Sequence, residues 1–262
     1  MNITLSNNAR ATIISATGDR ADRRAAAAIP VIIEGPESPV RQQAVAVREA
    51  ASVFATEATN IVGIFTPNAR TGQLRNLAAR TLANPIQRLM EAGQAEARAI
   101  AAAWARMIAV PVADATAAML RQHDRSAFVP LAIGEKAAWI NRASVEQLAA
   151  LIEAGRTRFA DMPPEIWDQV ERRYAALNFI RLAGTAVDYT CQPTVDEPLA
   201  TGVDMEAAER AANEGLDRHD KRADIIEGVE QAIQGITSVV ALTSDTDVCA
   251  AFALLTTGKV QP

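Results

Sequence analysis

Apolar residues recur at steps of three and four along most of the chain, the spacing of one face of an α-helix. The first clear stripe follows Ser38-Pro39, where a capping residue precedes a proline at the first helical position. Its members are Val40, Ala44, Val47, Ala51, Phe54, Ala58 and Ile61. We expect a helix that ends at Gly63 and Pro67. Because large and small residues alternate along the stripe, a neighbouring helix can approach closely.

A second stripe predicts a helix from Asn84-Pro85 to Val110, before Pro111, with Gln87 placed as in a capping box. The stripe consists of Ile86, Met90, Gly93, Ala97, Ile100, Trp104 and Met107. A glycine inside a helix costs about 1 kcal/mol relative to alanine, so Gly93 predicts close packing against another backbone. Shorter helices are expected over 73–82 and 112–122.

Further helices are expected in the second half of the chain. Ser144 and Gln147 form a capping box that opens a helix over 145–154, closed by Gly155 and preceded by a loop at 130–134. Pro163-Pro164 opens another helix that runs to about residue 187. After a loop over 188–203, acidic helices are expected over 205–216 and 222–239. For residues 239–256 a hairpin and a helix both remain open.

The first 36 residues favour short strands. Two β-capable runs, 2–5 and 11–15, flank the turn-forming Ser6-Asn7-Asn8, and a third covers 29–33 with Pro30 indicating a sheet edge. The predicted fold is therefore mainly α: a helical bundle with a small β element, either an N-terminal hairpin or an arm. The predicted organisation is an N-terminal β element (1–36), a helical core (37–187) and an acidic C-terminal helical segment packed on that core (188–262).

Composition indicates that the core is built from small side chains. Of the 262 residues, 49% are hydrophobic, but 55 are alanine and only eleven are aromatic. Such a core buries little apolar area per residue, so the stripes gain stability when a second copy or a partner covers them. We therefore expect a subunit that assembles.

The net charge of −5 is distributed unevenly, with 16 basic and 11 acidic residues over 1–142 but 10 and 20 over 143–262. This asymmetry suits head-to-tail association of identical subunits or contact with nucleic acid at one end, and equally suits two ordinarily solvated halves. The sequence has no run of 18 uncharged apolar residues and no basic start followed by an apolar stretch. We therefore expect no membrane partner and no export signal, and a cytoplasmic or virion location.

The candidate chemistry favours no enzyme. A metal-dependent phosphohydrolase of the HD type would have to use His123, His219-Asp220 and Asp245. The interval from His123 to His219 is too long for that family, and Asp245 follows Asp220 too soon. Both histidines also lie in charged, surface-like segments. Cys191 and Cys249 have no CxxC partner, which favours buried reduced thiols over a disulfide. Neither Gly258-Lys259 nor the region of Gly134 forms a phosphate-binding loop. We predict no catalytic residues, no cofactor and no metal.

Two features point weakly to nucleic acid. The segment Ile140–Leu148 resembles the opening helix of helix-hairpin-helix DNA-binding modules over about ten residues, but those modules need a glycine-hydrophobic-glycine hairpin where this chain has Glu153-Ala154-Gly155. An ordinary capped helix is favoured. The second feature is a set of arginines whose spacing spreads them around a helix, so that they are interpreted as solvated charge. These are Arg70, Arg75, Arg80, Arg88, Arg98 and Arg106.

The leading hypothesis is a non-enzymatic structural or assembly protein that forms a homo- or hetero-oligomer. Its alanine-rich helices, short β arms and general character resemble virion or connector components of tailed bacteriophages, such as a head–tail connector or tail element. The expected partners are further copies of the chain and other structural proteins. The alternatives are the HD-type phosphohydrolase and a helical protein that binds DNA non-specifically.

Overall fold

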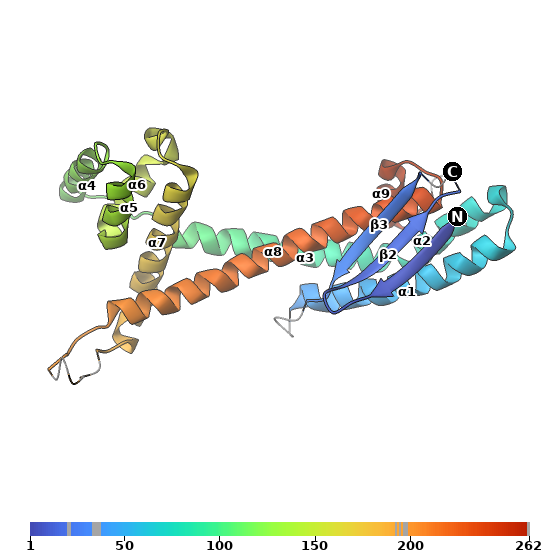
Figure 1. Cartoon of the computed structure of the whole chain (residues 1–262), viewed down its shortest axis with the longest axis horizontal. Helices are drawn as coiled ribbons and strands as arrows, with labels where there is room; N and C mark the ends of the chain where they lie inside the picture. The colour runs from blue at the N-terminus through green and yellow to red at the C-terminus, as the bar shows by residue number, and fades with distance from the viewer. Residues whose placement is uncertain (20–21, 33–37, 192, 194, 196–198, 261–262) are drawn as a thin grey trace. The chain divides into compact units, whose positions relative to one another are not determined.

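The computed structural model describes residues 1–19, 22–32, 38–191, 193, 195 and 199–260. Within these residues the protein is 71% helical, with nine α-helices and one three-stranded antiparallel sheet at the N-terminus (Figure 1). The predicted mainly helical fold with a small β element is confirmed.

Residue contacts divide the chain into two compact units. Unit 1 comprises residues 1–99 and 222–262, and unit 2 comprises residues 100–221. This grouping differs from the sequence segments 1–36, 37–187 and 188–262, because two long helices contribute to both interiors. These are α3 (Ala83–Met107) and α8 (Met205–Thr243).

The sheet of unit 1 consists of β1 (Asn2–Asn7), β2 (Ala11–Thr17) and β3 (Arg24–Pro30) in that order, drawn in dark blue in Figure 1. The first two strands confirm the predicted runs and extend each of them by two residues. The turn lies later than expected, because the Asn8 side chain accepts hydrogen bonds from the backbone N–H groups of Arg10 and Ala11 and so closes the hairpin there.

The third strand lies earlier than predicted. We expected it over 29–33, but β3 covers Arg24–Pro30 and includes four consecutive alanines; residues 33–37 lie outside the described residues. Pairing with β2 along its whole length outweighs the low β-propensity of alanine. Alanine also suits the packing, because a Cβ added at Gly235 of α8 would lie 2.8 Å from the Cα and Cβ atoms of Ala27. The strand is an edge of the sheet, as Pro30 predicted, but it ends at that proline and does not continue to residue 33.

Two helices continue unit 1 after the sheet. The predicted stripe is buried in α1 (Pro39–Ile64) except at Ile61, which is half-buried, and the helix continues through Gly63. Ser38 occupies the N-cap position, but among the described residues its side chain makes no capping hydrogen bond. The next helix, α2 (Pro67–Thr81), begins six residues before the predicted start.

The helices α3 and α8 supply a further part of the interior of unit 1. The Gly93 prediction is wrong in one respect: the nearest atom to a Cβ added there is a methyl group of Val229 at 3.7 Å, an ordinary side-chain contact. The close backbone approach occurs at Gly235 instead. Glycine at that position lets α8 lie directly on β3.

In the acidic C-terminal region, the structure corrects one prediction and decides between two alternatives that the sequence left open. The two helices expected over 205–216 and 222–239 form one continuous 39-residue helix, α8, because the charged residues between them include no helix breaker. Residues Val248–Thr257 form a helix, α9, and not a hairpin strand. Asp247 caps this helix by accepting a hydrogen bond from the N–H group of Ala250 at 2.8 Å, which favours the helical alternative.

Unit 2 contains α4 (Ala115–Phe128), α5 (Ile133–Arg142), α6 (Val145–Ala154) and α7 (Pro164–Ala183), with short 3₁₀ turns at Arg156–Phe159 and Thr185–Asp188. The capping box of α6 is formed as predicted, since Ser144 accepts from the N–H group of Gln147 and the Gln147 side chain accepts from that of Ser144. The helix α7 ends four residues before the predicted limit, at Gly184 in the left-handed conformation.

The interior of unit 2 is not built from small side chains. Phe128, Phe159 and Trp167 are buried in it, and the Phe128 ring centroid lies 5.0 Å from that of Trp139 and 5.8 Å from that of Phe159. The low aromatic content of the chain predicted a thin core, which is wrong for this unit because eight of the eleven aromatic residues lie between residues 100 and 221.

Candidate functional site

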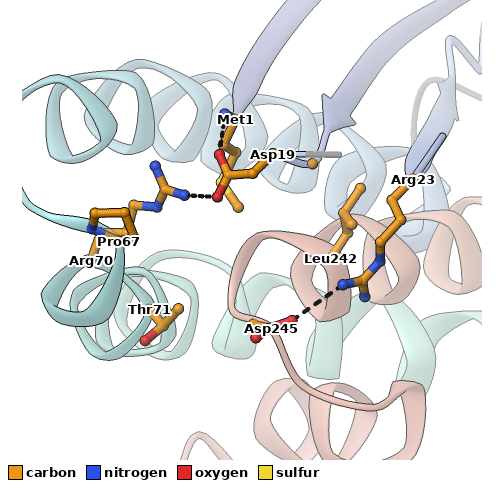
Figure 2. Close-up of a pocket in the computed structure, with 9 residues that line it drawn as sticks. Met1, Asp19, Arg23, Pro67, Arg70, Thr71, Leu242 and Asp245 are labelled. Carbon is orange, nitrogen blue, oxygen red and sulfur yellow. Dashed lines mark hydrogen bonds and ion pairs between the residues drawn. The ribbon is translucent and has the colours of Figure 1, made fainter. Parts of the chain in front are cut away.

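A cavity of about 590 Å³ lies in unit 1, where four parts of the chain meet (Figure 2). Its walls come from Met1, from the connection between β2 and β3, from the first two turns of α2, and from the end of α8 with the connection to α9. Among the described residues, four charged side chains line it: Asp19, Arg23, Arg70 and Asp245.

Asp19 is the centre of one ion-pair cluster in this cavity. One carboxylate oxygen lies 2.6 Å from the terminal ammonium group of Met1, and the other pairs with Nη2 of Arg70. The hydrogen bond from the ammonium group, together with the charge of Arg70, lowers the pKa of the Asp19 carboxyl below its ordinary value. This cluster joins the sheet to the start of α2.

The two partners of this pair differ in exposure. The Arg70 side chain is 9% exposed, whereas that of Asp19 is 56% exposed. Nε of Arg70 is buried and has no hydrogen-bond partner among the described residues. The guanidinium group is thus fixed in the wall, and the carboxylate borders solvent.

A second ion pair joins other parts of the same cavity. Nη1 of Arg23 lies 3.4 Å from a carboxylate oxygen of Asp245, and both side chains are more than half exposed. Asp245 follows the end of α8 and adopts a φ of 48°, in the left-handed region that aspartate tolerates better than most residues. Cations and anions therefore alternate around the cavity, which suits the binding of a polar ligand.

The sequence offers no signal for this site. Arg70 and Asp19 are 51 residues apart, and Arg23 and Asp245 are 222 residues apart. Asp19 and Arg23 lie in a charged stretch of ordinary appearance, and Arg70 was grouped with the arginines that were interpreted as solvated. Only the packing of unit 1 brings the four side chains together.

Unit 1 also carries an apolar groove of about 260 Å³ along the seam between α3 and α8. Gly93, Ala97 and Val229 lie along it, and Phe252 of α9 borders it with 42% of the residue exposed. The polar residues at the groove are Gln94, Glu230 and Gln234. The groove therefore leaves one side of the seam between α3 and α8 open to solvent.

The residues considered for an HD-type site have other contacts. His123 is exposed on α4, whereas His219 is half-buried, contrary to the expectation that both histidines lie at the surface. The His219 ring lies 5.6 Å from the Trp104 ring, its Nε2 lies 3.2 Å from the Ile100 carbonyl oxygen and its Nδ1 lies 3.5 Å from Asp220. Within the described ranges, no group of three or more His, Cys, Asp or Glu side chains could hold a metal ion.

Several of the arginines considered for nucleic-acid binding contact other parts of unit 1 or their own helix. Arg70 is buried, so its interpretation as solvated charge is wrong. Arg80 pairs with Glu57 at 2.6 Å, and Nε of Arg75 donates to the Ser244 carbonyl at 3.3 Å. Arg98 donates to Gln94, and Arg106 donates to a carbonyl one turn back in the same helix.

Unit 2 contains a buried polar network that holds the segment after α3. The Asn178 side chain, fully buried, donates to the Met107 carbonyl at 2.7 Å, and the Tyr174 hydroxyl donates to the Ala109 carbonyl at 2.9 Å. Arg121, 3% exposed, donates to the Pro111 carbonyl at 3.1 Å. These bonds satisfy carbonyl groups of a segment without regular secondary structure.

Carboxylates extend the same network. Glu153 accepts from Arg125 at 2.8 Å and from Arg121 at 3.1 Å, and these hydrogen bonds lower the pKa of its carboxyl. Glu146 accepts from Arg181 at 3.0 Å and from Arg121 at 3.4 Å. The network links α4, α6 and α7 and acts as structural support for unit 2.

Both cysteines are free, and Cys249 is exposed, which corrects its interpretation as a buried thiol.

In the part of the chain that the structure describes, one helix, α8, contains a window apolar enough to cross a membrane by length and composition, with 44% of that window buried. One such helix is weak evidence for a membrane span, because the core helix of a soluble protein passes the same test.

Comparison of the chain with protein-family models, with curated proteins and with solved structures finds no match.

Proposed function

We propose that this protein is a non-enzymatic assembly subunit that associates with copies of itself through the apolar groove of unit 1. The observation that carries the proposal is the open side of the α3–α8 seam, where small residues leave a hollow and a large exposed side chain, Phe252, lies beside it. An exposed apolar surface of this kind loses its contact with water when a partner covers it.

The groove favours a second copy as the occupant. A twofold interface uses the same surface on both subunits, so that surface must contain both a projection and a recess. Phe252 supplies the projection, and the hollow along Gly93 and Ala97 supplies the recess. In a twofold pair, Phe252 of each copy would enter the hollow of the other.

The more specific form of the proposal is a virion component, such as a bacteriophage head–tail connector or tail element. It is supported by the alanine-rich helices and by the leading β element, and it needs the self-association described above. In this form, the twofold dimer is the building block of the assembly, and a ring would need a second, heterologous interface.

Sedimentation velocity over a wide range of protein concentration tests the proposal. The unmodified protein should show a concentration-dependent oligomer, and Phe252→Asp should shift it towards the monomer. Phe65→Asp is a matched control, because Phe65 is 40% exposed and lies in unit 1 outside the residues lining the groove. Circular dichroism verifies that both variants fold.

Two outcomes would contradict the proposal. A monomer at every concentration would exclude self-association. An oligomer that both aspartate variants weaken equally would place the interface elsewhere than the groove.

A further inference from the structure

We propose that the charged cavity of unit 1 binds a phosphate group, held by Arg70 and Arg23. This site is separate from the apolar groove and does not depend on the proposed assembly function. The evidence comes from the burial of Arg70, from the start of α2 and from the solvent exposure of the two carboxylates.

Within the described part of the chain, Arg70 presents a fixed cation with one unused donor, Nε, while its Nη2 pairs with Asp19. A guanidinium group has five N–H donors, and a buried donor without an acceptor costs free energy unless a water molecule, an ion or a ligand satisfies it. The Arg70 side chain is nine-tenths buried in the cavity wall, and its Nε has no partner among the described residues. Arginine matches the geometry of phosphate oxygens because it can donate two parallel hydrogen bonds.

The start of α2 adds positive potential on the same wall. Pro67, Arg70 and Thr71, all in the first turns of this 15-residue helix, line the cavity. The first turn contains no acidic residue, and Thr66 at the N-cap makes no side-chain capping bond among the described residues. No acidic residue of α2 itself compensates the N-terminal end of the helix dipole; Asp19, which pairs with Arg70, is the carboxylate that a bound anion would displace there.

The two carboxylates act as displaceable occupants of the cationic positions. Asp19 is 56% exposed and Asp245 is 68% exposed, so either can turn into water when a stronger anion takes its partner. Arg23 lies across the cavity from Arg70 and is itself 54% exposed, so it can close over a bound anion (Figure 2). A phosphate dianion offers more acceptor oxygens and more charge than either carboxylate.

The proposal predicts that removing a positive and removing a negative side chain have opposite effects on phosphate binding. Removing a cation should weaken binding, whereas removing a competing carboxylate should strengthen it. Isothermal titration calorimetry with inorganic phosphate and, in a separate arm, with glycerol 3-phosphate measures both effects on the full chain. Tighter binding of the ester would identify the phosphate group of a larger molecule, and tighter binding of phosphate would identify the free ion.

We expect Arg70→Gln to abolish binding, and Asp19→Asn and Asp245→Asn each to tighten it by about tenfold. Arg80→Gln is the matched control, because it removes an ion pair of unit 1, with Glu57, that lies outside the cavity lining. It should bind as the unmodified protein does. If Asp19→Asn fails to fold, Asp245→Asn provides the same test at the other end of the cavity.

Three results would overturn the proposal. The first is no binding of either anion by the unmodified protein and by Asp245→Asn. The second is equal binding by Arg70→Gln and the unmodified protein. The third is weaker binding by both carboxylate variants, which would show that the carboxylates support the site and do not compete for it.

Discussion

Unit 1 and unit 2 fill their interiors with different side chains. In unit 1, backbones approach closely over small residues, as where Gly235 of α8 meets Ala27 of β3. In unit 2, four aromatic rings pack together around Phe128, and a buried polar network holds the segment after α3. All three tryptophans and eight of the eleven aromatic residues belong to unit 2. An average composition over the whole chain therefore describes neither interior.

Charge differs between the units as well. Unit 1 has 13 basic and 13 acidic residues, and unit 2 has 13 basic and 18 acidic residues. The strong charge asymmetry between residues 1–142 and 143–262 is much smaller between the two units, because residues 222–262 belong to unit 1. The remaining net charge of −5 lies entirely in unit 2, which disfavours that unit as a nucleic-acid surface.

The largest expected effect tests the aromatic interior of unit 2. Phe128→Ala should destabilise the fold by about 3–5 kcal/mol, because it leaves a cavity among rings that cannot close over it. Phe179→Ala, at a residue that is 45% exposed, is the control and should change stability little. Urea unfolding followed by tryptophan fluorescence measures both, since every tryptophan reports on unit 2. Equal effects would contradict an interior centred on Phe128.

The next effect tests the close packing of unit 1. Gly235→Ala should destabilise it by about 1–3 kcal/mol, because the new Cβ meets strand backbone that cannot move aside. Gly72→Ala in α2 is the control, since nothing lies within 4 Å of its added Cβ, and it should stabilise the helix by about 1 kcal/mol. Circular dichroism during thermal unfolding measures the loss of stability in the first variant and the gain in the second. Stabilisation by both variants would rule out close contact between α8 and β3.

A smaller effect tests the polar network of unit 2. Tyr174→Phe keeps the buried ring and removes the hydroxyl that donates to the Ala109 carbonyl. The expected loss is about 1 kcal/mol, the usual net contribution of one hydrogen bond, because the Ala109 carbonyl keeps a longer hydrogen bond from Asn178 at 3.4 Å. Tryptophan fluorescence in urea measures it. Burial raises the pKa of this hydroxyl, so no titration of Tyr174 is expected near neutral pH.

The smallest effect is a dependence on pH that both units share. Asp19 in unit 1 and Glu153 in unit 2 have pKa values lowered by their cationic partners. Their contributions are fully present above the unfolded pKa values, 3.8 and 4.5, and are lost as the pH falls through the lower folded values. Because both groups are largely solvent-exposed, each contributes at most about 1 kcal/mol.

Urea unfolding between neutral and acidic pH measures this dependence. Asp19→Asn and Glu153→Gln should each flatten the fall in stability on acidification. A wild-type protein whose stability rises as the pH drops below 4.5 would contradict the sign of both shifts.

The sequence alone determined the elements whose signals are local. The stripe from Val40 to Ala58, the capping box of Ser144 and Gln147 and the strand pair at the N-terminus needed only periodicity, capping chemistry and turn residues, all of which act within a few residues. The sequence did not predict that α8 is continuous or that α9 is a helix, because charged residues and short apolar runs are compatible with more than one local conformation.

Only the tertiary structure decided where distant residues meet. It placed an alanine run in β3 through pairing with β2 and contact with Gly235, and it brought Asp19 to Arg70 and Arg23 to Asp245. Ion pairs and close backbone contacts depend on distances in space, and no local pattern encodes a partner that lies 51 or 222 residues away. The concentration of aromatic residues between residues 100 and 221 is visible in the sequence, but only the contacts in space show that this segment forms a unit of its own.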